Sequence, residues 1–226
     1  KIIALLKKIK DITSASPSLK EIKTYYDELA PSFSTPSDFY QFIKENLQEL
    51  KSFIIQKELF YEFPDEPLII RETPEYMRGG GGISISQPPY FSENPITYYN
   101  IDPFENLSEA ELKEFFKEYN PFTVKILNIH EAIPGHYFQG AIGRKCPIPS
   151  FYLFSDMAFV EGWAVYSENL MLENGYSSNE LEFYYKKWFQ RILLNTIIDY
   201  EIHCKNTGKD EIIRKLVEDG FQQTYE

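Results

Sequence analysis

The chain of 226 residues is poor in cysteine and has fewer basic than acidic side chains. Its two cysteines, Cys146 and Cys204, allow at most one disulfide, which excludes a small cystine-stabilised scaffold. The 23 basic and 34 acidic residues give a formal net charge of -11, which argues against a nucleic-acid partner and an anionic membrane surface. No apolar stretch reaches the ~18 residues of a membrane-spanning helix, so we expect no membrane insertion.

Hydrophobic residues make up 43% of the chain, which predicts a folded protein with a buried core. The first residue is lysine, and the sequence stops at Glu226 inside a helix-like segment. We therefore expect residues 1–226 to form a single helical domain that is the carboxy-terminal part of a larger protein. The cellular compartment and the oligomeric state stay open at this point.

Residues 1–62 are predicted to be helical. The stretch from Thr35 to Asp38 combines a capping hydroxyl, a first-turn proline and an early acid, which is typical of a helix start. Apolar side chains then recur at helical spacing: Phe39, Ile43, Leu47, Leu50 and Ile54.

Residues 63–103 differ in composition and are predicted to form a small sheet with long connections. They contain prolines, glycines and three short β-prone runs, at 68–70, 83–86 and 96–99. Residues 104–226 are predicted to be helical again, with capping boxes at Ser108 and Glu111 and at Ser177 and Glu180. The expected fold class is mainly α with a small β-sheet inserted.

The first chemical motif is the run Asn-Ile-His-Glu-Ala-Ile-Pro-Gly-His at 128–136. Zinc hydrolases use a His-Glu pair on a helix to place a metal ligand beside a general base, usually with a second histidine at i+4. Here the second histidine is at i+6, so on a regular helix the two imidazoles would point about 120° apart. Pro134 and Gly135 break the helix between them, so both histidines can reach one metal.

Two further motifs lie downstream. Glu161 and Glu168 are seven residues apart, so they share one helix face and can bring a carboxylate ligand to the His-Glu site. On the helix expected from 181 to 206, polar side chains recur every four residues: Arg191, Asn195, Asp199 and His203. Such a stripe should face a wet cavity. The residues alone leave a hydrolytic metal site and a metal-free structural reading as equal alternatives.

The motifs resemble the bacterial "domain of unknown function 885" family. The similar residues are His130 to His136 with Gln139, Glu161 to Glu168, and Asp199 with His203, joined upstream by Glu72-Thr73-Pro74 and Tyr98-Tyr99-Asn100. The resemblance spans about residue 72 to the end and implies a helical fold related to gluzincin-type zinc metallopeptidases. Family members are considerably longer. The chain departs from the pattern at Asn195, where an arginine is expected.

We expect a zinc-dependent hydrolase of the peptidase type that acts on peptides or peptide-like amides. In this hypothesis His130, His136 and Glu161 are the zinc ligands and Glu131 is the general base. His203, held by Asp199, stabilises the oxyanion or binds a substrate carboxylate, and Tyr99 is a weaker candidate for the same role. Glu168 and Arg191 support the site from behind these residues. The alternatives are a non-catalytic helical binding or scaffold module, and a zinc hydrolase of a non-peptide amide or ester.

Overall fold

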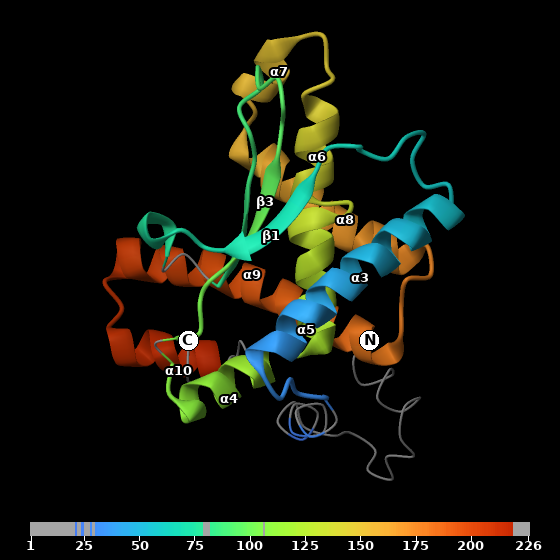
Figure 1. The fold of residues 1–226 in the computed structure, drawn as a ribbon. Coiled ribbons are helices and arrows are strands. Elements are labelled where there is room, and N and C mark those ends of the chain that lie inside the picture. Colours follow the sequence, from blue (N-terminus) through green and yellow to red (C-terminus); the bar gives the residue numbers. More distant parts are fainter. Residues whose placement is uncertain are drawn as a thin grey trace. The chain divides into compact units, whose positions relative to one another are not determined.

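The structure is a computed structural model that describes residues 30–78, 82–105 and 107–218, together with Glu21, Thr24 and Glu28 (Figure 1). Its backbone contacts divide the chain into two compact units. The sheet unit comprises Thr35–Asn106 and Val124–Ser177, and the helical unit comprises Lys1–Ser34, Leu107–Thr123 and Ser178–Glu226. The single domain over 1–226 stays a prediction. Most of the predicted helical region before residue 30 lies outside the described residues.

The sheet unit begins with helix α3 (Pro36–Gln56), as the sequence predicted. The Thr35 hydroxyl accepts a hydrogen bond from the Asp38 backbone N–H, and the Asp38 carboxylate accepts one from the Thr35 N–H. These two bonds satisfy backbone donors that the first turn leaves unpaired. The predicted apolar face is buried at every position: Phe39, Ile43, Leu47, Leu50 and Ile54.

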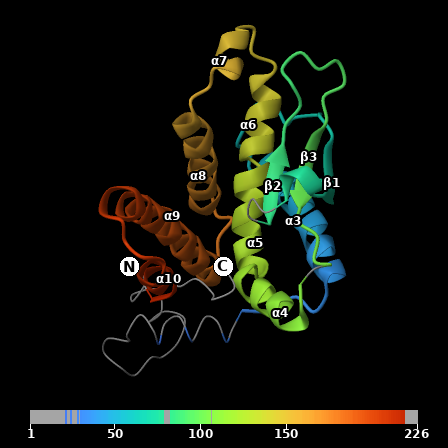
Figure 2. The ribbon, with the colours of Figure 1, turned by 90° about the vertical axis from the view of Figure 1, so that its left-hand side faces the viewer.

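A three-stranded sheet follows, and its strands confirm the three predicted runs: β1 (Leu68–Glu72), β2 (Ile83–Ser86) and β3 (Thr97–Ile101). A short 3-10 turn, Glu75–Met77, lies between β1 and β2. The strand order is β1-β3-β2, with β3 parallel to β1 and antiparallel to β2 (Figure 2). The last strand in the sequence is thus the central one, and its Tyr99 and Ile101 are fully buried.

The candidate site lies on the helical segments that follow. Helix α5 (Pro121–Leu127) begins in the helical unit and ends in the sheet unit. The chain then passes through a π-helical turn (Asn128–Ala132), α6 (His136–Gly143), α7 (Pro149–Leu153) and α8 (Met157–Glu173). Helix α8 packs against α6 and the π-helical turn, and Figure 2 shows α6 and α8 side by side. The largest fully buried apolar side chains of this unit form its core: Phe39, Ile43, Leu50, Tyr99, Ile101, Ile126, Ile129 and Met171.

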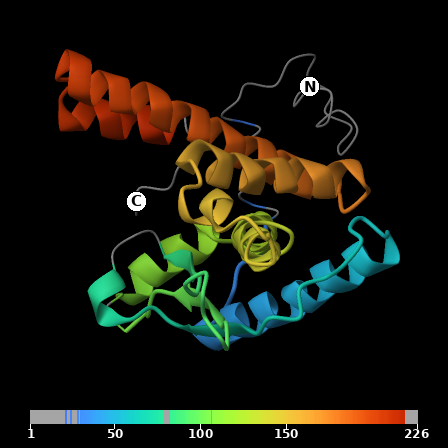
Figure 3. The same cartoon turned by 90° about the horizontal axis from the view of Figure 1, so that it is seen from above.

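The helical unit contains α4 (Glu109–Glu118), α9 (Asn179–Lys205) and α10 (Lys209–Glu218). The capping box at Ser108 and Glu111 is confirmed. The one at Ser177 and Glu180 is wrong by one residue, because the Ser178 hydroxyl is the group that reaches the backbone N–H of Leu181. Helix α10 runs beside α9 (Figure 3), and four side chains pack between them: Leu194, Ile198, Ile212 and Leu216.

The two units together confirm a mainly helical protein with a small inserted sheet. Among the described residues, no helix is both long and apolar enough to cross a membrane.

Candidate metal centre

The two histidines of the first motif lie on either side of a helix interruption, as predicted. The interruption starts earlier than Pro134 suggested, because the backbone already widens at the π-helical turn. Ile133 donates its N–H to the carbonyl of Asn128 (3.0 Å), and Gly135 donates to the carbonyl of Ile129 (2.9 Å). These bonds span five and six residues in place of four, so the extra residues of the i+6 spacing are accommodated. The imidazole centroids of His130 and His136 lie 4.9 Å apart.

The interruption requires glycine at position 135. A Cβ atom there would lie 1.7 Å from the carbonyl oxygen of His130, and this oxygen belongs to rigid backbone. Side chains from distant parts of the unit hold the same segment. Trp163 Nε1 donates to the carbonyl of Pro134 (2.9 Å), and Gln87 Nε2 donates to the carbonyl of His136 (2.6 Å). The segment is therefore fixed by tertiary contacts as well as by its own sequence.

Helix α8 brings both predicted carboxylates to the histidines. Glu161 Oε2 lies 3.5 Å from His130 Nε2 and 3.7 Å from His136 Nε2. Glu168 Oε1 lies 2.7 Å from Nδ1 on the other side of the His130 ring. The Glu168 side chain is fully buried, whereas the Glu161 side chain is 53% exposed. The shared face thus gives its two acids different surroundings, one open to solvent and one enclosed.

The donor atoms of His130, His136 and Glu161 suit a zinc ion. All three lie within 4.8 Å of one another. Nitrogen and oxygen ligands at ~2.0–2.2 Å in tetrahedral geometry lie about 3.3–3.5 Å apart. The two nitrogen-to-oxygen distances are close to this spacing. The carboxylate of Glu168 behind His130 also fits, because ligating histidines commonly donate their second ring N–H to a carboxylate.

The acids around the histidines set their protonation. Burial opposes charge on His130, but its hydrogen bonds with Glu161 and Glu168 outweigh this effect and raise its pKa to about 10. Burial lowers the pKa of His136, and the charge of His130 acts in the same direction. The hydrogen bond with His130 lowers the pKa of Glu161. The pKa values of the two rings are therefore shifted in opposite directions, and a metal that binds His130 must displace a proton.

Glu131 lies beside this group without being part of it. Burial raises its pKa to about 7, the charge of His130 opposes the rise, and Glu161 and Glu168 add to it. A carboxyl group with a pKa close to neutral can accept and release a proton under ordinary conditions. This is the property that the predicted general base requires.

Tyr99 belongs to a buried polar network that the sequence did not predict. Its side chain is fully buried, and its hydroxyl donates to Asn128 Oδ1 (2.6 Å). Asn128 donates to Asn46 (2.8 Å), which in turn donates to the Tyr176 hydroxyl (2.7 Å). This network ties the π-helical turn to β3, α3 and the segment after α8. The only sequence signal for it is an asparagine next to the His-Glu motif, and the catalytic role of Tyr99 stays a prediction.

The remaining candidates lie in the helical unit, on α9. His203 Nε2 lies 3.5 Å from Asp199 Oδ1, as the spacing predicted, and both side chains are largely exposed. The Arg191 guanidinium lies over the Trp188 ring. The predicted roles of these residues in catalysis and in support of the site stay predictions.

Comparison with known proteins identifies relatives of the chain. A solved structure of a candidate lipoprotein of unknown function from Shewanella oneidensis is 35% identical, with a TM-score of 0.81 over 99% of this chain and 41% of that chain. A candidate lipoprotein from Colwellia psychrerythraea shares the fold at 19% identity, with a TM-score of 0.76 over 99% of this chain and 37% of that chain. The chain thus spans less than half the length of either protein.

The comparison with curated proteins gave no match. The family described as "Bacterial protein of unknown function (DUF885)" matches residues 2–226. The chain belongs to this bacterial family.

Proposed function

We propose that the sheet unit carries the centre of a zinc-dependent hydrolase of the peptidase type, which cleaves peptide or peptide-like amide bonds. The observation that carries the proposal is the convergence of two imidazole nitrogens and a carboxylate oxygen within 4.8 Å, beside a second carboxylate of nearly neutral pKa. A relationship to the gluzincin-type metallopeptidases, suggested by the His-Glu motif, is part of this proposal.

The zinc ion would be held by Nε2 of His130, Nε2 of His136 and a carboxylate oxygen of Glu161. Glu168 would hold the Nδ1–H of His130 and so keep the ring in the orientation and tautomer that ligation needs. When bound, zinc supplies a Lewis acid that polarises a carbonyl oxygen and lowers the pKa of a water molecule. The half-exposed Glu161 leaves the centre open to a substrate.

Glu131 would transfer the proton during hydrolysis. Its carboxylate oxygen would take a proton from the attacking water and later give that proton to the leaving nitrogen. Partial burial supports this role, because it raises the pKa of Glu131 to about 7 and so allows both steps near neutral pH. The covalent chemistry therefore needs no nucleophilic side chain.

Two rival functions lead to different measurements. A metal-free binding or scaffold module would use the same residues as a buried polar network and would bind no zinc. A zinc hydrolase of a non-peptide amide or ester would bind zinc but would not cleave peptides. Metal analysis separates the first rival, and a panel of peptide, amide and ester substrates separates the second.

The central test replaces the general base. Glu131→Gln should keep a full complement of zinc while hydrolysis falls by at least the ~10²–10⁴-fold that general-base catalysis contributes. Glu173→Gln is the matched control, because Glu173 is exposed at the end of α8 and takes no part in the proposed centre. Hydrolysis by Glu131→Gln near the parent rate would remove its role, and a parent protein without zinc would favour the scaffold.

A further inference from the structure

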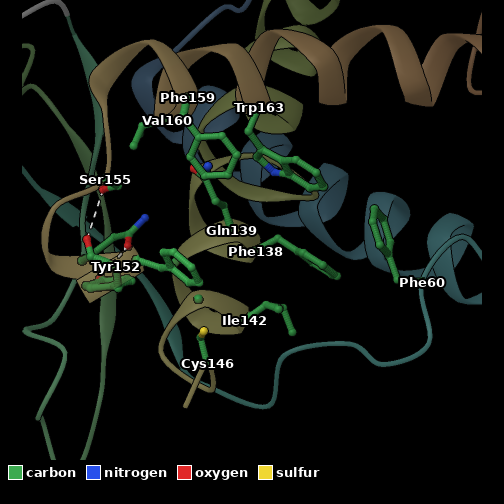
Figure 4. A pocket seen from close by; sticks show the side chains of 14 residues that line it. Phe60, Phe138, Gln139, Ile142, Cys146, Tyr152, Ser155, Phe159, Val160 and Trp163 are labelled. Carbon is green, nitrogen blue, oxygen red and sulfur yellow. Dashed lines mark hydrogen bonds between the residues drawn. The ribbon is translucent and has the colours of Figure 1, made fainter. Parts of the chain in front are cut away.

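An apolar cavity of about 580 Å³ lies in the sheet unit, between α6, α7 and α8. Figure 4 shows Phe159 and Trp163 on α8 facing Phe138 and Gln139 on α6. Among the described residues that line the cavity, none is charged. Its volume falls within the ~300–1,000 Å³ of typical small-molecule sites.

The cavity and the candidate metal centre are built on the same two helices. Phe138 and Gln139 follow the proposed ligand His136 by two and three residues on α6. Phe159 and Trp163 stand two residues before and after the proposed ligand Glu161 on α8. Residues three apart share a helix face, so Gln139 puts a part of the cavity wall on the side of α6 that carries His136, whereas side chains two residues from a ligand point to another side of their helix. A peptide with its scissile bond at the metal centre could reach the cavity past Gln139 with a neighbouring side chain.

Two features of the lining indicate an occupant. Phe159 is 62% exposed although it lies on a cavity wall, so a ligand there would remove aromatic surface from water. The wall around it is apolar as well and includes Phe138, Ile142 and Trp163, so it would favour an apolar group.

We infer that this cavity is the specificity pocket of the centre and accepts a large apolar side chain, aromatic or long aliphatic, of a peptide substrate. Charged side chains are excluded, because they would lose their hydration against an uncharged wall. The inference rests on the proposed function, since it names the substrate class of the same centre.

Binding can be measured without turnover. The chain has two tryptophans, so a Trp188→Phe background leaves Trp163, on the cavity wall, as the single fluorophore. Acetyl-phenylalanine amide should change this fluorescence and bind about ten- to a hundredfold more tightly than acetyl-glycine amide, because a phenyl ring leaves water. Equal binding of the two probes would overturn the inference.

A charge placed in the wall should remove this preference. Ile142 lines the cavity and is the penultimate residue of α6, whereas Ile55 is the penultimate residue of α3, is 55% exposed and lies outside the cavity. Ile142→Asp should weaken acetyl-phenylalanine amide binding at least tenfold, and Ile55→Asp should leave it within twofold. Unchanged binding by a folded Ile142→Asp would contradict the pocket.

Chemical blocking avoids any change of fold. Cys146 lines the cavity, and the second cysteine, Cys204, is exposed in the helical unit and can be replaced by serine. N-phenylmaleimide on Cys146 should abolish acetyl-phenylalanine amide binding while zinc content stays unchanged. Labelled protein that still binds the probe would count against the inference.

The two proposals fail separately. Hydrolysis without preference between phenylalanine and glycine substrates would overturn the pocket and leave the zinc hydrolase standing. Selective binding of the phenylalanine probe by a protein without zinc or hydrolysis would support the pocket and overturn the proposed catalysis.

Discussion

His130 and His203 each lie beside a carboxylate, yet the two pairs differ in nearly every physical respect. In the sheet unit, His130 and Glu168 are 2.7 Å apart, with side chains 10% and 0% exposed. In the helical unit, His203 and Asp199 are 3.5 Å apart, with side chains 72% and 77% exposed. Exposed ion pairs contribute about 0–1 kcal/mol, so the second pair holds its histidine weakly. A neighbouring carboxylate alone therefore does not distinguish a candidate ligand, and His130 differs from His203 in being buried and in converging with His136 and Glu161.

The two pairs also arise differently. Asp199 and His203 meet because residues four apart are neighbours on any regular helix. His130 meets Glu168 only because α8 packs on the π-helical turn and because the turn aims both histidines at α8. The buried pair therefore depends on tertiary structure, and it should be the easier of the two to destroy.

The largest effect should come from the interruption itself. Gly135→Ala places a methyl group against the carbonyl of His130 and should destabilise the fold by about 4 kcal/mol or more, with loss of zinc binding. The control is Gly162→Ala, since a Cβ at that exposed position of α8 meets no atom within 4 Å. It should stabilise by up to about 1 kcal/mol. Urea denaturation measures both, and a parent-like Gly135→Ala would show that the interruption is dispensable.

Helix α9, in the helical unit, also carries a buried ion pair. It tests whether burial, or membership of the sheet unit, determines how strongly a charged pair affects stability. Lys187 Nζ lies 2.8 Å from Glu118, with side chains 8% and 3% exposed, whereas its neighbour Lys186 pairs with Glu182 at side chains that are 29% and 38% exposed. Lys187→Met leaves a buried carboxylate unpaired and should cost about 3–5 kcal/mol of unfolding free energy. Lys186→Met should cost about 0.5 kcal/mol at most. Similar losses of unfolding free energy in the two variants would show that burial does not determine the contribution of an ion pair.

The two acid partners can be compared through zinc affinity. Glu168→Gln removes the charge behind His130 and should weaken zinc binding about 10–100-fold, although no ligand is touched. Asp199→Asn should leave the affinity within about twofold, because its pair is exposed. Chelator competition gives both values, with circular dichroism as the check on folding. An equal loss in both variants would place His203 at the metal.

The smallest structural effect is expected at His203. His203→Ala should change the unfolding free energy by about 0.5 kcal/mol or less and keep the zinc content, since its side chain is 72% exposed. If the predicted catalytic role holds, the turnover number falls all the same. Loss of zinc from this variant would make His203 a ligand and the assignment of His136 wrong.

Local rules within the sequence determined the elements. The hydroxyl of Thr35 and the spacing of apolar residues after it specify α3, because caps and helical periodicity act within a few residues. The β-prone runs specify the strands for the same reason. Pro134 and Gly135 predict the interruption, and the seven-residue spacing of Glu161 and Glu168 predicts that they share a face of α8.

Tertiary structure alone decided how these elements meet. No local pattern places β3 between β1 and β2, or brings Asn46 to Asn128 and Gln87 to His136. Nor does spacing distinguish the half-exposed Glu161 from the enclosed Glu168, since both stand on one face of α8. Burial, and with it the pKa of each acid, depends on segments far away in the chain, so the chemistry of the centre could be read only from the folded protein.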